Sequence, residues 1–301
     1  MGAIIMDGRA MGAAMTPYLQ EQVSCLAGKH AMVPTLAAVL VGSDEASVQY
    51  VRNKRRLAKA IGIGSMTIEI AAAEATTGRL IAEVERLNRD DRITGILIQL
   101  PLPAGVDVNQ LFDAIDPAKD VDGVASATVV GIYRAAGATF VPCTPRGVLA
   151  LMRRYEVPIA GRHAVVIGRS DIAGKPLAMM LGGRQCNATV TWCHRHTRGL
   201  DSLCREADIL VPCVGADPTD RRFLISPCMV KPGACVIDVG FRRMADGSFA
   251  GDVDFEQVRR VAGWITPNPG GVGPMTVLAL MQNVIDAARF RLGLPPSDYP
   301  V

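Results

Sequence analysis

The 301-residue sequence has few aromatic side chains, and neither sign of charge is in clear excess. Phe, Trp and Tyr together make up 5% of the residues, which argues against the base-stacking surfaces of single-strand nucleic-acid binders. The 32 Lys and Arg residues nearly balance the 29 Asp and Glu residues, and the resulting net charge of +3 does not indicate a nucleic-acid partner. No apolar run reaches the roughly 18 residues that cross a bilayer, so we expect no contact with a membrane.

Paired cysteines are missing as well. The eight cysteines contain no Cys-x-x-Cys pair, a pattern typical of reduced, buried thiols in a cytoplasmic protein. Asp7 and Arg9 fall where a signal peptide would be apolar. His194 and His196 lie two residues apart, but no third ligand is nearby in sequence, so no metal site is predicted. These features favour a cytoplasmic globular protein.

The sequence does contain a repeated alternation of short apolar runs and helical segments. Strands are expected at 36–41, 68–72, 95–100, 163–167, 188–192, 208–211 and 235–239, and helices at 47–60, 77–90, 145–155 and 275–290. Strands that alternate with helices predict parallel sheets with right-handed crossovers, and the length suggests two α/β domains. Ligands of such sheets bind at the carboxyl ends of the strands.

A glycine-containing turn follows the strand at 163–167. Gly168 and Gly174 bracket a strand-to-helix turn that would let the backbone approach a pyrophosphate at the helix amino terminus, although Ser170 occupies the middle glycine position. The next strand ends in the basic segment 194–198 and has no acidic residue for a ribose hydroxyl. With Arg169, this segment suits a 2′-phosphate and favours NADP. An ordinary tight turn and a solvated basic loop are the alternative interpretations.

Candidate catalytic residues occur in the first half of the chain. Tyr50 and Lys54 are four residues apart, so they share one face of a basic helix, although this spacing alone is also common by chance on surface helices. Gln99 ends a buried strand, where a polar side chain favours a ligand contact. Asp120 and Asp122 place two carboxylates in one loop, where turn capping is the simpler interpretation.

Motifs along nearly the whole chain resemble those of the bifunctional methylenetetrahydrofolate dehydrogenase/methenyltetrahydrofolate cyclohydrolase family. They occur in the family's order and include SxxYVxxK (residues 47–54), GILIQLPLP, KDVDG, CTPxG (residues 143–147), VVIGRSDIAGKP, KPGACVIDVG, GDVDF and PGGVGPMT. The resemblance implies a folate-facing α/β domain, residues 1–141 with the returning final helix 275–301. It also implies a Rossmann-type NAD(P)-binding domain, residues 142–274, and a cleft between the two domains for both ligands.

The resemblance further implies an activity. The family oxidises 5,10-methylenetetrahydrofolate with NADP and hydrolyses the 5,10-methenyl product to 10-formyltetrahydrofolate, a one-carbon donor for purine biosynthesis. It implies a homodimer, a folate substrate with or without a polyglutamate tail, and no nucleic-acid partner. A monofunctional dehydrogenase or cyclohydrolase, or a catalytically silent folate- and dinucleotide-binding protein, remains the alternative.

By resemblance, Lys54 is the principal catalytic group, Gln99 orients it, Tyr50 stacks on the folate rings and Asp122 holds the pterin. Gly271 and Pro274 would line the folate site. The cofactor-binding residues would be Gly168, Arg169, Ser170, Gly174, Arg195, Ile237 and Thr276.

Three positions depart from the family pattern. Arg195 replaces a phosphate-binding serine, Asn268 replaces the usual valine before Pro269, and Ala173 replaces a larger aliphatic residue. A guanidinium still binds phosphate, so NADP remains the expected cofactor.

Overall fold

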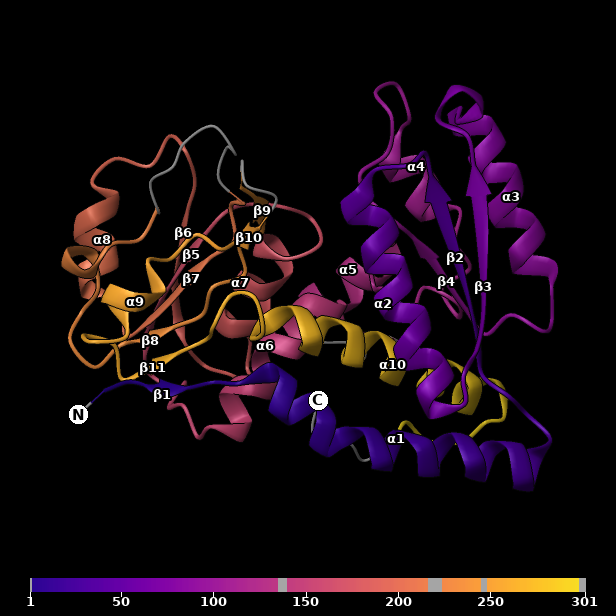
Figure 1. Ribbon diagram of the computed structural model, residues 1–301, viewed down its shortest axis with the longest axis horizontal. Coiled ribbons are helices and arrows are strands. Elements are labelled where there is room, and N and C mark those ends of the chain that lie inside the picture. The colour runs from indigo at the N-terminus through magenta and orange to yellow at the C-terminus, as the bar shows by residue number, and fades with distance from the viewer. Residues whose placement is uncertain (1, 135–139, 216–223, 245–247, 298–301) are drawn as a thin grey trace. The chain divides into compact units, whose positions relative to one another are not determined.

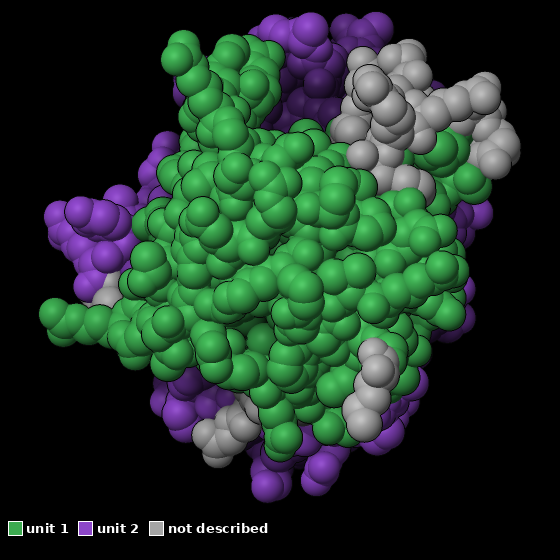
Figure 2. Space-filling view, turned by 90° about the vertical axis from the view of Figure 1, so that its left-hand side faces the viewer, with its two compact units in different colours: residues 1–12, 144–276 green, residues 13–143, 277–301 purple. Residues whose placement is uncertain are grey.

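The computed structural model describes residues 2–134, 140–215, 224–244 and 248–297. The chain forms two compact units (Figure 2). Unit 1 comprises Met1–Gly12 and Thr144–Thr276, and unit 2 comprises Ala13–Cys143 and Val277–Val301. Two long helices, α1 (Gly8–His30) and α10 (Val272–Arg291), each contribute residues to both units.

Unit 2 is built on a parallel three-stranded sheet in the order β3-β2-β4 (Figure 1). Its strands are β2 (Thr35–Val41), β3 (Gly64–Ile70) and β4 (Gly95–Ile98). Its other helices are α2 (Glu45–Ile61), the 3₁₀ turn η1 (Ala72–Glu74), α3 (Thr77–Arg89), α4 (Val108–Asp113) and α5 (Ser126–Arg134). The central strand β2 is buried along almost its full length, which explains its continuous apolar sequence.

Helix α2 has clear sequence signals at both ends. The Asp44 carboxylate accepts a hydrogen bond from the Ser47 backbone N–H at 2.8 Å, which caps the amino terminus. Gly62 ends the helix with φ +87°, a left-handed conformation that favours glycine. These two caps define where α2 begins and ends. Tyr50 and Lys54, four residues apart between the caps, project from the same face of the helix.

Unit 1 contains a six-stranded parallel sheet in the order β1-β11-β8-β7-β5-β6. Its strands are β1 (Ile4–Ile5), β5 (His163–Ile167), β6 (Thr189–Cys193), β7 (Ile209–Pro212), β8 (Cys235–Val236) and β11 (Trp264–Ile265). A separate antiparallel pair joins β9 (Arg242–Arg243) to β10 (Phe249–Ala250). Its helical segments are α6 (Cys143–Arg154), α7 (Gly174–Gly182), α8 (Leu200–Glu206), η2 (Pro227–Met229) and α9 (Phe255–Val258).

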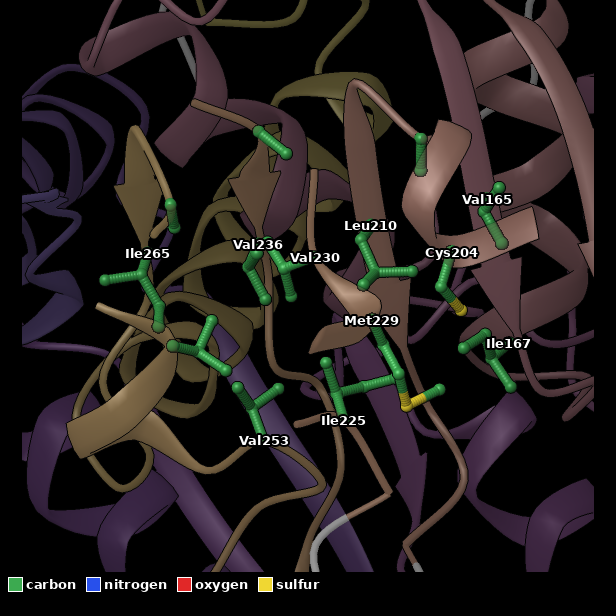
Figure 3. Close-up of a cluster of buried hydrophobic side chains, with 14 of the residues drawn as sticks. Val165, Ile167, Cys204, Leu210, Ile225, Met229, Val230, Val236, Val253 and Ile265 are labelled. Carbon is green, nitrogen blue, oxygen red and sulfur yellow. The ribbon is translucent and has the colours of Figure 1, made fainter. Parts of the chain in front are cut away.

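A buried apolar cluster supports one face of this sheet (Figure 3). Val165, Leu210, Val236 and Ile265 come from four strands that neighbour one another in the sheet, and each is fully buried. Cys204 of α8 is also fully buried in the cluster. By packing side chains of neighbouring strands against one another, the cluster stabilises the sheet that carries the loops at the carboxyl ends of the strands.

The predicted α/β class is confirmed, with parallel sheets and a final helix whose residues from Val277 onward belong to unit 2. The structure differs from the expected boundary at the amino terminus. Ile4 of β1 pairs with Trp264 of β11, so residues 1–12 belong to unit 1 rather than to the domain expected at 1–141. Within the described part of the chain, no helix is long and apolar enough to span a membrane.

Candidate active site

Lys54 and Gln99 form a hydrogen-bonded pair in unit 2. Lys54 lies on α2 one turn after Tyr50, and both side chains are partly buried. The Lys54 Nζ donates to Gln99 Oε1 at 3.0 Å. The spacing along the helix singled out Lys54, and the position after β4 singled out Gln99. The structure joins the two side chains by a hydrogen bond.

A second bond fixes the orientation of the Gln99 amide. Its Nε2 donates to the Leu100 carbonyl at 2.7 Å, which leaves Oε1 directed to Lys54. The Gln99 backbone N–H donates to Val39 O at 2.9 Å and continues the β2–β4 ladder by one residue. Gln99 is therefore held at both backbone and side chain.

Burial and nearby charge act on Lys54 in opposite directions. Burial is the larger influence and lowers the pKa of the Lys54 ammonium, while Asp122 and Cys143 favour the charged form. Burial also raises the pKa of Tyr50 to about 12, so its phenol stays neutral. An amine whose pKa is lowered and that is held by an amide oxygen is a candidate for proton transfer.

The two loop carboxylates have different surroundings. Asp120 is fully buried and accepts hydrogen bonds from the Gly123 and Ala125 backbone N–H groups at 3.1 and 3.0 Å and from the Thr128 hydroxyl at 2.7 Å. Turn capping, the simpler interpretation of the pair, therefore describes Asp120. Asp122 is only partly buried and acts electrostatically on Lys54.

In unit 1, a turn at the end of β5 requires glycine at two positions. Gly168 has φ +122°, and a Cβ there would lie 2.7 Å from Cys213 O. A Cβ on Gly174 would lie 2.4 Å from Gly168 O, so the first residue of α7 packs directly on the turn. The N-cap residue Ala173 provides no side-chain hydrogen bond to the helix amino terminus. These features fit a turn that presents backbone N–H groups to a phosphate.

Arg169 and Arg195 follow the ends of two paired strands. Ile167 of β5 pairs with Cys193 of β6, and Gly168 N donates to Cys193 O at 2.9 Å. Both arginine side chains are exposed at this edge of the sheet, as is Ser170. The register thus brings together the two basic segments that the sequence analysis associated with a 2′-phosphate.

The remaining predicted residues of unit 1 lie at other positions on this unit. Ile237 is buried directly after β8. Gly271 packs closely on the amino terminus, since a Cβ on Gly8 would lie 1.8 Å from Gly271 O. Pro274 is in the first turn of α10, and the Thr276 hydroxyl donates to Thr144 Oγ1 at 3.2 Å.

Two features of unit 1 were not predicted. The indole N–H of Trp192 donates to Gly168 O at 2.6 Å, so an exposed tryptophan adjoins the glycine turn. Asp238 and Asp252 form a buried carboxylate pair in which the Asp252 N–H donates to Asp238 Oδ1 at 2.9 Å. Both aspartates occur within motifs of the family resemblance, but their burial depends on tertiary contacts. No group of three His, Cys, Asp or Glu side chains suited to a metal occurs among the described residues.

Comparison with protein families gives two matches in succession along the chain. The catalytic domain of tetrahydrofolate dehydrogenase/cyclohydrolase matches residues 6–122. The NAD(P)-binding domain of the same enzymes matches residues 142–292. The chain belongs to the tetrahydrofolate dehydrogenase/cyclohydrolase family. The resemblance stated from sequence motifs is thereby confirmed.

Relatives in this family match over nearly their whole length. The bifunctional protein FolD of Acidiphilium cryptum is 47% identical over 292 residues, which cover 97% of this chain and all of the relative. The crystal structure of the bifunctional FolD enzyme of Campylobacter jejuni has a TM-score of 0.90 at 38% identity and covers 96% of this chain and 99% of its own. The Trypanosoma brucei dehydrogenase-cyclohydrolase, solved with NADP and an inhibitor, also has a TM-score of 0.90, at 35% identity, and covers 97% of this chain and 99% of its own.

Proposed function

We propose that this protein oxidises 5,10-methylenetetrahydrofolate to 5,10-methenyltetrahydrofolate with NADP and then hydrolyses the product to 10-formyltetrahydrofolate. Family membership supports both activities. Within the chain, the observation that carries the proposal is the Lys54–Gln99 hydrogen bond beside the partly buried Tyr50.

The first reaction needs positioning more than proton transfer. Removal of a hydride from the carbon that bridges two folate nitrogens leaves a cation shared by the N–C–N group, and no proton is lost. Bound NADP supplies the hydride acceptor. A charged ammonium at Lys54 would oppose the developing cation, and burial counters this by lowering the pKa of Lys54. Tyr50 would hold the flat ring system in place. Such positioning of the reacting groups supplies most of the rate gain in a hydride transfer.

The second reaction requires a base and then an acid. Water adds to the methenyl carbon and loses a proton; the bond from that carbon to one nitrogen then breaks, and the nitrogen takes up a proton. The neutral Lys54 amine can accept the first proton and return it in the second step. Gln99 Oε1 orients the amine through its 3.0 Å hydrogen bond. Such general acid–base catalysis contributes roughly 10²–10⁴-fold.

The residues of unit 1 fit a dinucleotide phosphate. The space that a Cβ would fill at Gly168 and Gly174 is taken by backbone. The N-cap residue Ala173 offers no side-chain acceptor to α7, and the Gly174 N–H donates to Ser170 Oγ at 3.4 Å. We assign the pyrophosphate to this turn and the 2′-phosphate to Arg169 and Arg195. The Ser170, Ile237 and Thr276 contacts belong to the same proposal.

The substrate tail, assembly and location of the protein are further parts of the proposal. Exposed Arg52, Arg55, Arg56 and Lys59 surround Lys54 on α2 and would attract the carboxylates of a folate polyglutamate tail. We assign Asp122 to the pterin, and Gly271 and Pro274 to the wall of the folate site. We also propose that the protein is cytoplasmic and forms a homodimer. Sedimentation of the purified protein would test the homodimer.

The function is tested by supplying the purified protein with methylenetetrahydrofolate and either NADP or NAD. Reduction of NADP faster than NAD supports the dehydrogenase activity and the phosphate role of Arg195. Methenyl absorbance that decays faster than in buffer supports the cyclohydrolase activity. Reduction of NAD alone would refute the cofactor assignment. Reduction without accelerated decay would indicate a monofunctional dehydrogenase.

A further inference from the structure

Asn283 is a fully buried amide on α10 that joins two segments of unit 2. Its Nδ2 donates to Val121 O at 2.7 Å and to Val141 O at 3.0 Å. The same nitrogen lies 3.5 Å from Cys143 Sγ. One side chain therefore contacts both chain segments through their carbonyl groups.

These two segments carry the titratable neighbours of Lys54. Val121 immediately precedes Asp122, and Val141 lies two residues before Cys143. Asp122 and Cys143 are the titratable groups that act on the pKa of Lys54. A displacement of either segment would therefore change the electrostatic surroundings of the amine.

The segments also pack backbone against backbone. Gly123 has φ +72°, and a Cβ there would lie 2.7 Å from Pro142 N. The Cys143 thiol donates to Val121 O at 3.3 Å, the same carbonyl that accepts from Asn283. Asn283 thus adds two hydrogen bonds from α10 to a contact that the two segments already make with each other.

We propose that Asn283 is a positioning residue for the proton-transfer step, because its amide holds the Val121–Asp122 segment against residues 141–143 and so keeps Asp122 in place beside Lys54. The inference rests on the proposed function. It extends the Lys54–Gln99–Asp122 arrangement to a residue about 160 positions after Val121 in sequence, which acts through the backbone carbonyl groups that it binds.

The expected effect on pH dependence has a definite sign. The Asp122 carboxylate raises the pKa of Lys54, and burial lowers it. Cys143 is the other titratable group that acts on Lys54, Gln99 is neutral, and the raised pKa of about 12 keeps Tyr50 neutral. When Asp122 moves away, burial is less opposed, so the pKa of Lys54 falls. The acid limb of hydrolysis, which follows the neutral amine, should then shift to lower pH.

The test compares Asn283→Leu with Asn88→Leu. Asn88 makes a similar amide-to-carbonyl bond in the same unit, 2.8 Å to Ala114 O, and has no contact with residues 121–123 or 141–143 among its described hydrogen bonds. In Asn283→Leu we expect kcat for methenyltetrahydrofolate hydrolysis to fall by roughly 10–100-fold, as for a misplaced catalytic group, with its acid limb at lower pH. Asn88→Leu should keep the wild-type pH profile, and NADP affinity should be unchanged in both.

A measurement independent of activity separates this inference from the proposed function. NMR titration of isotopically labelled lysines, with Lys54 assigned from the Lys54→Met variant, gives the pKa of Lys54 directly. A lower pKa in Asn283→Leu than in wild type supports the inference even if wild-type protein is inactive. An unchanged Lys54 pKa in folded Asn283→Leu would overturn it, even if the wild type performs both reactions.

Discussion

Replacement of Lys54 by methionine removes the proposed base while preserving most of the length of the side chain. General acid–base catalysis is worth roughly 10²–10⁴-fold, which at 1.36 kcal/mol per factor of ten corresponds to about 3–5 kcal/mol of the hydrolysis barrier. Gln99 Oε1 loses its 3.0 Å partner, at a cost of about 1–3 kcal/mol. Replacement of a partly buried polar amine by an apolar group offsets part of that cost, so we expect the variant to fold.

The assay is the decay of methenyltetrahydrofolate absorbance with and without enzyme. Hydrolysis by Lys54→Met should fall to the rate in buffer, while folate affinity, measured by equilibrium binding, should survive because Tyr50 and Asp122 remain. Lys29→Met is the matched control, because Lys29 is an exposed lysine on α1 in the same unit, has no part in the proposed sites, and its replacement should leave activity unchanged. Unchanged hydrolysis in folded Lys54→Met would refute the assignment of Lys54.

Three further predictions concern binding and stability. Asp122→Ala should weaken folate binding more than NADP binding, and equal folate affinity in titrations of variant and wild type would count against the pterin role. Arg195→Ala should raise the Kd for NADP about tenfold or more through loss of a charge-assisted bond and leave NAD affinity unchanged; an equal loss for both nucleotides would exclude a contact with the 2′-phosphate. Burial, and to a smaller extent the charge of Asp252, raises the pKa of Asp238 to about 7 against the opposing effect of the hydrogen bonds that its carboxylate accepts. Because the folded state then binds more protons than the unfolded state, the stability that Asp238 confers is lost as pH rises from about 4 to 7. Asp238→Asn should remove that loss, gaining about 1.4 kcal/mol per pH unit relative to wild type in denaturant unfolding across this range; parallel pH curves would contradict the raised pKa.

Much of the fold could be predicted because its central strands are buried on both faces. The strand expected at 36–41 corresponds to Thr35–Val41, and the one expected at 163–167 to His163–Ile167. Ile4–Ile5 carries no such signal, since a two-residue strand depends on its pairing with Trp264–Ile265. Helix α1 was not predicted, and it contains Pro17, which is unfavourable inside a helix.

Some residues of the candidate site could likewise be placed from local sequence, whereas others depend on tertiary contacts. Helical spacing places Tyr50 and Lys54 on one face, and a strand end marks Gln99, so local sequence was sufficient to place these residues, whereas their roles came from the family resemblance. The distinct surroundings of Asp120 and Asp122 depend on which backbone N–H groups each carboxylate meets. Asn283 gave no local signal, because its role depends on carbonyl groups more than 140 positions earlier in the chain.

The most direct test of the account follows both reactions in one preparation of the wild-type protein. Purified enzyme is given methylenetetrahydrofolate and NADP, and NADPH and 10-formyltetrahydrofolate are quantified over time by absorbance and chromatography. The account predicts that both products form faster than in matched buffer, and that Lys54→Met abolishes the enzymatic formation of 10-formyltetrahydrofolate. Formation of NADPH with only the uncatalysed rate of 10-formyl product in the wild type would contradict it.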